Sequence, residues 1–203
     1  MRKYKNIIFD VGEVLLEYRW YEMLTKDRGL TPERAKLVGE AMFDSPMWHE
    51  MDLWVKPMDE IYEEFREAYP EYYEDIRWFI EHGEEMKVAR PDVWERVAAL
   101  KDAGYHLYLL SNYPKNLFDL HTSIFPFWDK IDGKVVSYEI HITKPDIEIY
   151  QHLIRKYQLD PKESLFFDDR PGNIEGAKAC GISGIQVTSK EQLIRELDAL
   201  LEE

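Results

Sequence analysis

Residues 4–14, YKNIIFDVGEV, hold a short apolar run that ends in an acid at Asp10. A run of this kind is typical of a buried strand in a parallel sheet. The same texture recurs over residues 106–111, 164–168 and 184–187. Helical patterns separate these runs: one begins at Pro91 and ends at Gly104, and another begins near Asp146. The alternation predicts an α/β fold, in which a parallel sheet carries helices on both faces.

Residues 19–88 have a different pattern, with no convincing β-run. Apolar side chains recur there at helical spacing, over residues 58–69 and again over 76–80. A helical insertion directly after the first strand of an α/β domain suggests a cap over an active site, and a bundle that only adds stability is the alternative. We therefore predict a catalytic core of residues 1–18 and 89–203 and a helical cap of residues 19–88.

Composition favours a small-molecule enzyme or a protein-binding module. The net charge is −14, and residues 59–85 hold eleven acids against Arg66 and Arg77, so we expect the surface to repel nucleic-acid phosphates. No apolar stretch approaches the roughly 20 residues of a membrane span. The single cysteine, Cys180, excludes an internal disulfide. We expect a cytoplasmic protein, a monomer or weak homodimer, that binds neither nucleic acid nor membrane.

The predicted strands end in residues with useful chemistry. Asp10, Ser111 and the pair Asp168-Asp169 stand at strand ends, and Lys144 precedes a helix. Ligands bind at the carboxyl ends of the strands in an open parallel sheet. The carboxylates can hold Mg²⁺, while the lysine and the hydroxyl can hold phosphate oxygens. Such a set is suited to phosphoryl transfer through a covalent aspartyl phosphate.

These segments resemble the four motifs of the haloacid dehalogenase superfamily. The run ending at Asp10 is similar to the first motif, Ser111-Asn112 to the second, Lys144-Pro145 to the third, and residues 168–173 (DDRPGN) to the fourth. The match keeps the family's order and spacing over residues 4–187, with the insertion where the family has its helical cap. The chain resembles the branch of the bacterial α-glucose-1-phosphate phosphatases and of the phosphatase domain of soluble epoxide hydrolases. The resemblance implies a Rossmann-like core.

The resemblance also implies a role for each residue. Asp10 would be the nucleophile and a metal ligand, the Gly12 carbonyl and Asp169 would complete a Mg²⁺ site, and Asp168 would help directly or through water. Lys144 and Ser111 would take part in catalysis. The residues expected to contact the substrate are Gly12, Glu13, Ser111, Asn112 and Lys144. The implied activity is Mg²⁺-dependent hydrolysis of a small phosphorylated metabolite, such as a hexose 1-phosphate.

Gly12 departs from the family pattern, because most family phosphatases have a second Asp there that protonates the leaving oxygen. Three interpretations follow: the activity is weak or lost, Glu13 or a cap residue supplies the proton, or the leaving group needs little help. The last is favoured, since related proteins with Asp-x-Gly resemble active sugar phosphatases. Halide chemistry is disfavoured, since a metal-free dehalogenase would have no use for Asp168-Asp169.

Two alternative functions remain open beside the phosphatase. A catalytically weakened binding or regulatory protein would explain Gly12 and the acidic cap. A phosphomutase or phosphotransferase would pass the aspartyl phosphate to a sugar instead of water. Among the remaining residues, we expect Trp20, Trp48 and Trp54 to pack in the cap interior, and Asn173 to orient Lys144 or a metal ligand.

Overall fold

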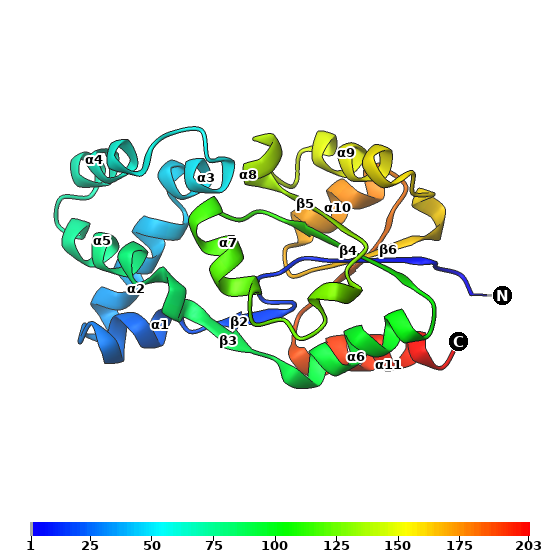
Figure 1. The fold of residues 1–203 in the computed structure, drawn as a ribbon. Helices are drawn as coiled ribbons and strands as arrows, with labels where there is room; N and C mark the ends of the chain where they lie inside the picture. Colours follow the sequence, from blue (N-terminus) through cyan, green and yellow to red (C-terminus); the bar gives the residue numbers. More distant parts are fainter. Residues whose placement is uncertain (1) are drawn as a thin grey trace.

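The computed structural model describes residues 2–203, so Met1, the first residue of the predicted core, lies outside the described part. Five parallel strands form the central sheet in the order β5-β4-β1-β6-β7 (Figure 1). Their bounds are β1 (Asn6–Phe9), β4 (His106–Ser111), β5 (Gly133–Val136), β6 (Ser164–Asp168) and β7 (Ser183–Gln186). Because β1 pairs with both β4 and β6, the carboxyl ends of these three strands are adjacent.

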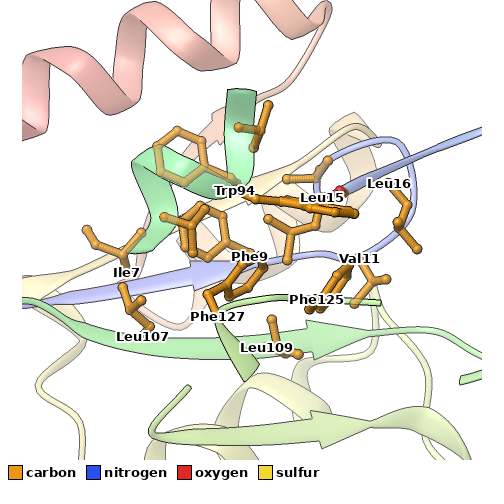
Figure 2. Close-up of a cluster of buried hydrophobic side chains, with 14 of the residues drawn as sticks. Ile7, Phe9, Val11, Leu15, Leu16, Trp94, Leu107, Leu109, Phe125 and Phe127 are labelled. Carbon is orange, nitrogen blue, oxygen red and sulfur yellow. Dashed lines mark hydrogen bonds between the residues drawn. The ribbon is translucent and has the colours of Figure 1, made fainter. Parts of the chain in front are cut away.

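Helices cover both faces of the sheet, which confirms the predicted α/β fold (Figure 1). Ile7 and Phe9 of β1 point into one cluster, with α6 (Pro91–Asp102) and α11 (Lys190–Leu201). Figure 2 shows this cluster, in which Trp94 of α6 lies over the strand residues. Ile8 points to the opposite face, toward α9 (Ile147–Tyr157) and α10 (Pro171–Ala179). Because side chains alternate between the two faces of a strand, Ile7, Ile8 and Phe9 are all apolar.

The edge strand β5 was not predicted from the sequence. Its four residues, GKVV, include only two buried apolar side chains, Val135 and Val136, which is too short a run to distinguish from a turn. Two helices flank it in the chain: α7 (Lys115–Thr122) before it and α8 (Ser137–Ile140) after it.

Helices between β2 (Leu16–Tyr18) and β3 (Lys87–Ala89) form a group beside the sheet, at the left of Figure 1. They are α1 (Trp20–Glu22), α2 (Pro32–Phe43), α3 (Pro46–Leu53), α4 (Met58–Ala68) and α5 (Tyr73–Glu81). The group has a hydrophobic cluster of its own. β2 and β3 pair antiparallel at its base. The expectation that residues 19–88 hold no β-run was wrong at their end, where β3 begins at Lys87; three residues are too few to show a β-period.

Local sequence explains where the helices of this group begin. Thr31 and Ser45 each accept a hydrogen bond from a backbone N–H in the first turn of α2 and α3, and each precedes a proline. Within residues 2–203, no helix combines the length and the apolar character needed to cross a membrane.

Candidate active site

The sheet topology brings the predicted site residues together at the carboxyl ends of the central strands. Asp10 follows β1, Ser111 ends β4 and Asp168 ends β6, while Lys144 reaches them from the loop before α9. A cavity of about 640 Å³ lies at this edge, between the sheet and the helical insertion. The sheet side of its lining includes Asp10, Gly12, Glu13, Asn112, Lys144, Asp169, Arg170 and Asn173. The insertion contributes Trp20, Phe43, Trp48, His49 and Asp52.

Asp10 is held by one of its two carboxylate oxygens. Oδ1 accepts hydrogen bonds from the Val11 backbone N–H (2.7 Å) and the Ser111 hydroxyl (2.6 Å), and it lies 3.0 Å from Lys144 Nζ. Among residues 2–203, no hydrogen bond reaches Oδ2. Burial raises the pKa of Asp10 to about 7, against the opposing effect of Lys144. The carboxylate is thus fixed in direction and leaves one oxygen open.

Ser111 therefore acts on Asp10 in this structure. Its side chain is fully buried, and its hydroxyl donates to the carboxylate rather than facing the cavity. The predicted contact between Ser111 and a phosphate stays a prediction.

Lys144 is fixed by Asp168 and by a backbone carbonyl. Its Nζ donates to Asp168 Oδ2 at 2.6 Å and to Leu110 O at 2.9 Å. Asn173 Nδ2 lies 2.9 and 3.0 Å from the two oxygens of Asp168, and the Arg170 N–H donates to Oδ1 at 2.8 Å. Burial alone would lower the pKa of Lys144, but Asp10 and Asp168 outweigh it and raise that pKa. The lysine is consequently charged, and Asp168 holds it in place.

Asn112 connects the second and third motif segments. Its Nδ2 donates to the Lys144 carbonyl at 2.9 Å, and its Oδ1 accepts the Lys144 N–H at 2.8 Å. Asn112 also lines the cavity, so it both positions the lysine backbone and is available to a ligand.

Three carboxylates form a group that suits a hard cation. Oxygens of Asp10, Asp168 and Asp169 all lie within 4.8 Å of one another. Burial, followed by the charge of Asp168, raises the pKa of Asp169. Lys144 and Arg170 supply two positive charges against these three, and carboxylate oxygens are the ligands that Mg²⁺ prefers. The donor set and its excess negative charge therefore fit a divalent ion; Gly12 also lines the cavity, and the role of its carbonyl stays a prediction.

Gly12 stands against the ring of Tyr18. A Cβ atom at Gly12 would lie 2.6 Å from the Tyr18 hydroxyl oxygen and 2.7 Å from its Cε2 atom. The tyrosine ring thus fills the space that a side chain at position 12 would need. The sequence alone gives no signal of this contact, since Tyr18 is one of thirteen tyrosines in the chain.

A chain of hydrogen bonds extends from Tyr18 into the interior. Tyr18 Oη bonds Tyr113 Oη at 2.7 Å, Tyr113 Oη bonds His121 Nδ1 at 2.6 Å, and His121 Nε2 bonds the Gly83 carbonyl at 2.8 Å. A carbonyl only accepts, so Nε2 carries the proton and Nδ1 accepts from Tyr113. Tyr113 must then accept from Tyr18. Burial lowers the pKa of His121 to about 4, which keeps the imidazole neutral and preserves this direction.

Glu13 holds the turn after β1. Its Oε1 accepts the Tyr18 N–H at 3.0 Å, and its Oε2 lies 3.4 Å from Nη2 of the buried Arg90. Arg90 Nη1 also donates to the carbonyls of Glu13 (2.7 Å) and Val14 (3.2 Å). Both carboxylate oxygens of Glu13 thus have protein partners. The predicted contact of Glu13 with a substrate stays a prediction.

The insertion presents an acid that the sequence argument did not single out. Asp52, near the end of α3, is half-buried and lines the cavity. Burial raises its pKa to about 7; Arg170 opposes the rise and Asp10 adds to it. Asp52 lies one helical turn after Trp48 and His49, which also line the cavity. That spacing places Trp48, His49 and Asp52 on one face of α3. The sequence does not show that this face points toward the sheet, because tertiary packing determines it.

Aromatic residues of the insertion line the cavity as well as packing in the interior of the insertion. Trp20 and Trp48 pack edge-on against Phe43, inside the insertion's own cluster, and all three also line the cavity. The cavity lining does not include Trp54. The expectation of packing holds for Trp20 and Trp48, and the same rings form part of the cavity wall.

Comparison with known proteins shows the family of the chain and relatives that are phosphatases. The family model described as haloacid dehalogenase-like hydrolase matches residues 4–181. A sesquiterpene phosphatase of Aspergillus oryzae is 30% identical over 114 residues, which are 55% of this chain and 58% of the relative. The D-ribitol-5-phosphate phosphatase of Bacteroides thetaiotaomicron is 32% identical over 106 residues, 48% of this chain and 50% of the relative. The matches thus span 58% and 50% of the lengths of these two relatives.

A solved structure extends the similarity in fold to nearly the whole chain. It is a HAD family enzyme of Bacteroides thetaiotaomicron in complex with magnesium and inorganic phosphate, with a TM-score of 0.71 and 21% identity. The superposition covers 92% of this chain and 96% of that one.

Proposed function

Because the chain belongs to the haloacid dehalogenase-like hydrolase family, we propose that it is a phosphatase that hydrolyses a small phosphorylated metabolite. The observation that carries this proposal is the environment of Asp10, whose Oδ1 is fixed by three donors while Oδ2 stays open. Oδ2 is then the oxygen that attacks phosphorus and forms an aspartyl phosphate. The similarity to two curated phosphatases supports a phosphate ester as substrate.

Lys144 supplies the charge that lets a phosphate approach a carboxylate. Its ammonium lies 3.0 Å from Asp10 and is buried, so its field is poorly screened. Asp168 and Leu110 O hold it in that place. Arg170 on the cavity wall adds a second positive group.

The proposed cofactor is Mg²⁺, held by Asp10 and Asp169 together with the Gly12 carbonyl that the sequence resemblance implies. Asp168 already accepts bonds from Lys144, Asn173 and the Arg170 N–H, so we assign it to positioning Lys144 more than to direct ligation. When bound, the ion supplies positive charge beside the phosphate oxygens.

The proposed substrate is a sugar phosphate such as a hexose 1-phosphate, and residues 19–88 are the proposed cap. A cavity of about 640 Å³ has room for a sugar-sized group beside the phosphate site. The rings of Trp20 and Trp48 offer apolar faces for its carbon skeleton, and His49 and Asn112 offer polar contacts. A cap in this position would exclude water from the first step. We place the activity in the cytoplasm, in a monomer or weak homodimer.

Turnover of an aryl phosphate with Mg²⁺ tests this function. Wild-type protein is expected to release p-nitrophenol from p-nitrophenyl phosphate, and Asp10→Asn is expected to lose about 10³-fold or more in kcat, because the nucleophile is gone. Glu67→Gln removes an equal charge from an exposed position outside the cavity lining and serves as the control. Metal binding without any turnover would instead favour the binding-protein alternative.

Labelled water separates hydrolysis from transfer to a sugar. Hydrolysis in H₂¹⁸O is expected to place one labelled oxygen in each phosphate released, because water attacks the phosphorus of the aspartyl phosphate. A phosphomutase or phosphotransferase would leave the phosphoryl group unlabelled. A panel containing α-glucose 1-phosphate, D-ribitol 5-phosphate and an isoprenoid phosphate would then rank the substrate classes.

A further inference from the structure

This inference rests on the proposed phosphatase function: an ordinary alkyl phosphate needs a proton donor for its departing oxygen, so a site that hydrolyses such an ester must supply one. Gly12 has no side chain, and the Tyr18 ring fills the adjoining space. The donor must therefore come from another residue that lines the cavity.

Tyr18 is the nearest hydroxyl to this space, but its proton is committed elsewhere. The chain from Tyr18 through Tyr113 to His121 ends on the Gly83 carbonyl, which fixes its direction away from the cavity. Turning the Tyr18 proton toward a ligand would leave two hydroxyl oxygens 2.7 Å apart with no proton between them. Burial also raises the pKa of Tyr18 further above its usual value. Tyr18 can accept a hydrogen bond from a ligand, but it is a poor donor.

Glu13 is also committed to the protein. Its two oxygens meet the Tyr18 N–H and Arg90 Nη2, contacts that hold the turn after β1. Releasing the carboxyl toward the cavity would break both contacts and remove one carboxylate partner of the buried Arg90 guanidinium.

Asp52 lines the cavity without such commitments. Among residues 2–203, its carboxyl takes part in no hydrogen bond or ion pair, whereas its backbone is fixed. The Ser137 hydroxyl donates to Asp52 O at 2.6 Å, and His141 Nδ1 bonds Leu53 O at 2.7 Å. Ser137 and His141 belong to α8 and its end, and Figure 1 shows α3 beside α8. The core therefore places the end of α3, and with it Asp52, at the cavity.

We propose that Asp52 is the general acid and base of the reaction. In the first step Asp10 Oδ2 bonds to phosphorus, the ester P–O bond breaks, and the leaving oxygen takes the Asp52 proton. In the second step the Asp52 carboxylate takes a proton from the water whose oxygen attacks phosphorus. The P–O bond to Asp10 then breaks, which frees phosphate and restores both acids to their starting forms.

The charges around Asp52 suit this cycle. Arg170 and Lys144 favour its ionised form, whereas burial and Asp10 favour the protonated form. The balance leaves the pKa at about 7, so both forms are populated near neutral pH. His49, one turn earlier on α3, is the other titratable group of this helix that lines the cavity.

The dependence on the leaving group tests Asp52. Wild type, Asp52→Asn and Glu50→Gln are compared with Mg²⁺ on p-nitrophenyl phosphate, whose leaving group needs no proton, and on the alkyl phosphate that wild type hydrolyses best. Asp52→Asn is expected to lose about 10²- to 10⁴-fold in kcat/KM on the alkyl ester and less than about tenfold on the aryl ester. Asp52→Glu is expected to recover part of the loss. Glu50 is the matched control, an acid on the same helix that pairs with Lys56 outside the cavity lining.

Each outcome decides between distinct conclusions. Equal losses on the two esters would make Asp52 a structural or binding residue and overturn the inference, as would unchanged turnover of both. Wild type that hydrolyses the aryl ester and no alkyl ester would also overturn it. Wild type inactive on both esters would contradict the proposed phosphatase function itself.

Discussion

His121 is a fully buried histidine whose two ring nitrogens both have partners, Tyr113 and the Gly83 carbonyl. Gly83 lies at the end of the helical insertion, whereas His121 belongs to α7. The ring therefore connects the two parts of the molecule through a neutral imidazole. A proton on Nδ1 would break the bond from Tyr113 and place an unpaired charge in the interior.

This arrangement predicts a stability that falls in mild acid. Burial lowers the pKa of His121 from 6.5 to about 4, so between these values the unfolded chain binds more protons than the folded one. The contribution of the neutral His121 to the free energy of unfolding is complete above about pH 6.5 and is lost as the pH falls toward 4. We expect the stability advantage of wild type over His121→Gln, measured by urea unfolding, to shrink by about 2 kcal/mol between pH 7 and pH 5.

The comparison with His121→Gln isolates the histidine. Asp10 and Asp52 have raised pKa values and give a contribution of opposite sign, but it is present in both proteins and cancels. A difference in unfolding free energy that stays constant from pH 7 to pH 5 would contradict the buried neutral imidazole.

At the scale of residues, the sequence predicts those parts of the site that depend on the sheet alone. Asp10, Ser111 and Asp168 follow apolar runs, and parallel strands bring their carboxyl ends together. Tyr18 and Asp52 could not be predicted in the same way. Their placement depends on how the insertion packs on the core, through contacts between segments that are distant in the chain.

At the scale of elements, the contact between α3 and α8 holds the insertion beside the cavity. His141 ends α8 with φ of 56°, a left-handed conformation that glycine adopts without strain, and its ring bonds the Leu53 carbonyl. His141→Gly therefore removes this hydrogen bond and keeps the backbone turn. A single bond of this kind contributes about 0.5–1.5 kcal/mol.

We expect His141→Gly to loosen α3 selectively. Amide hydrogen exchange over residues 46–53 should accelerate by about two- to tenfold, while exchange in β1 and β6 stays unchanged. The value of kcat/KM should fall, since Asp52 stands on the loosened segment. Faster exchange throughout the sheet would mean global destabilisation and would count against a local docking role.

Among the elements, the strands that carry apolar runs were predicted from the sequence, including the edge strand β7, whereas β2, β3 and β5 were not. The runs at residues 106–111 and 164–168 coincide with β4 and β6. The three-residue strands β2 and β3 gave no detectable period, and their pairing closes the insertion at its base. Helical spacing over residues 58–69 and 76–80 predicted α4 and α5, because one face of each is buried.

The whole molecule carries excess negative charge, with 40 acidic residues against 26 basic ones. Some of this charge is concentrated where Asp10, Asp168 and Asp169 converge beside the buried Lys144. Bringing these carboxylates together costs free energy in the folded state, and a bound divalent cation would relieve it. Folding and metal binding are therefore expected to be linked.

We predict that Mg²⁺ raises the thermal stability of the protein. At a concentration one hundredfold above Kd, a ligand that binds only the folded state adds about 2.7 kcal/mol, which for a chain of this size corresponds to roughly 5–10 °C in Tm. Asp169→Asn should abolish most of this shift, whereas Glu67→Gln, which removes an equal charge from an exposed helix, should retain it. NaCl at matched ionic strength separates specific binding from screening of the net charge. An equal shift with NaCl, or an undiminished response of Asp169→Asn, would show that the cation acts on the acidic surface and not at the three carboxylates.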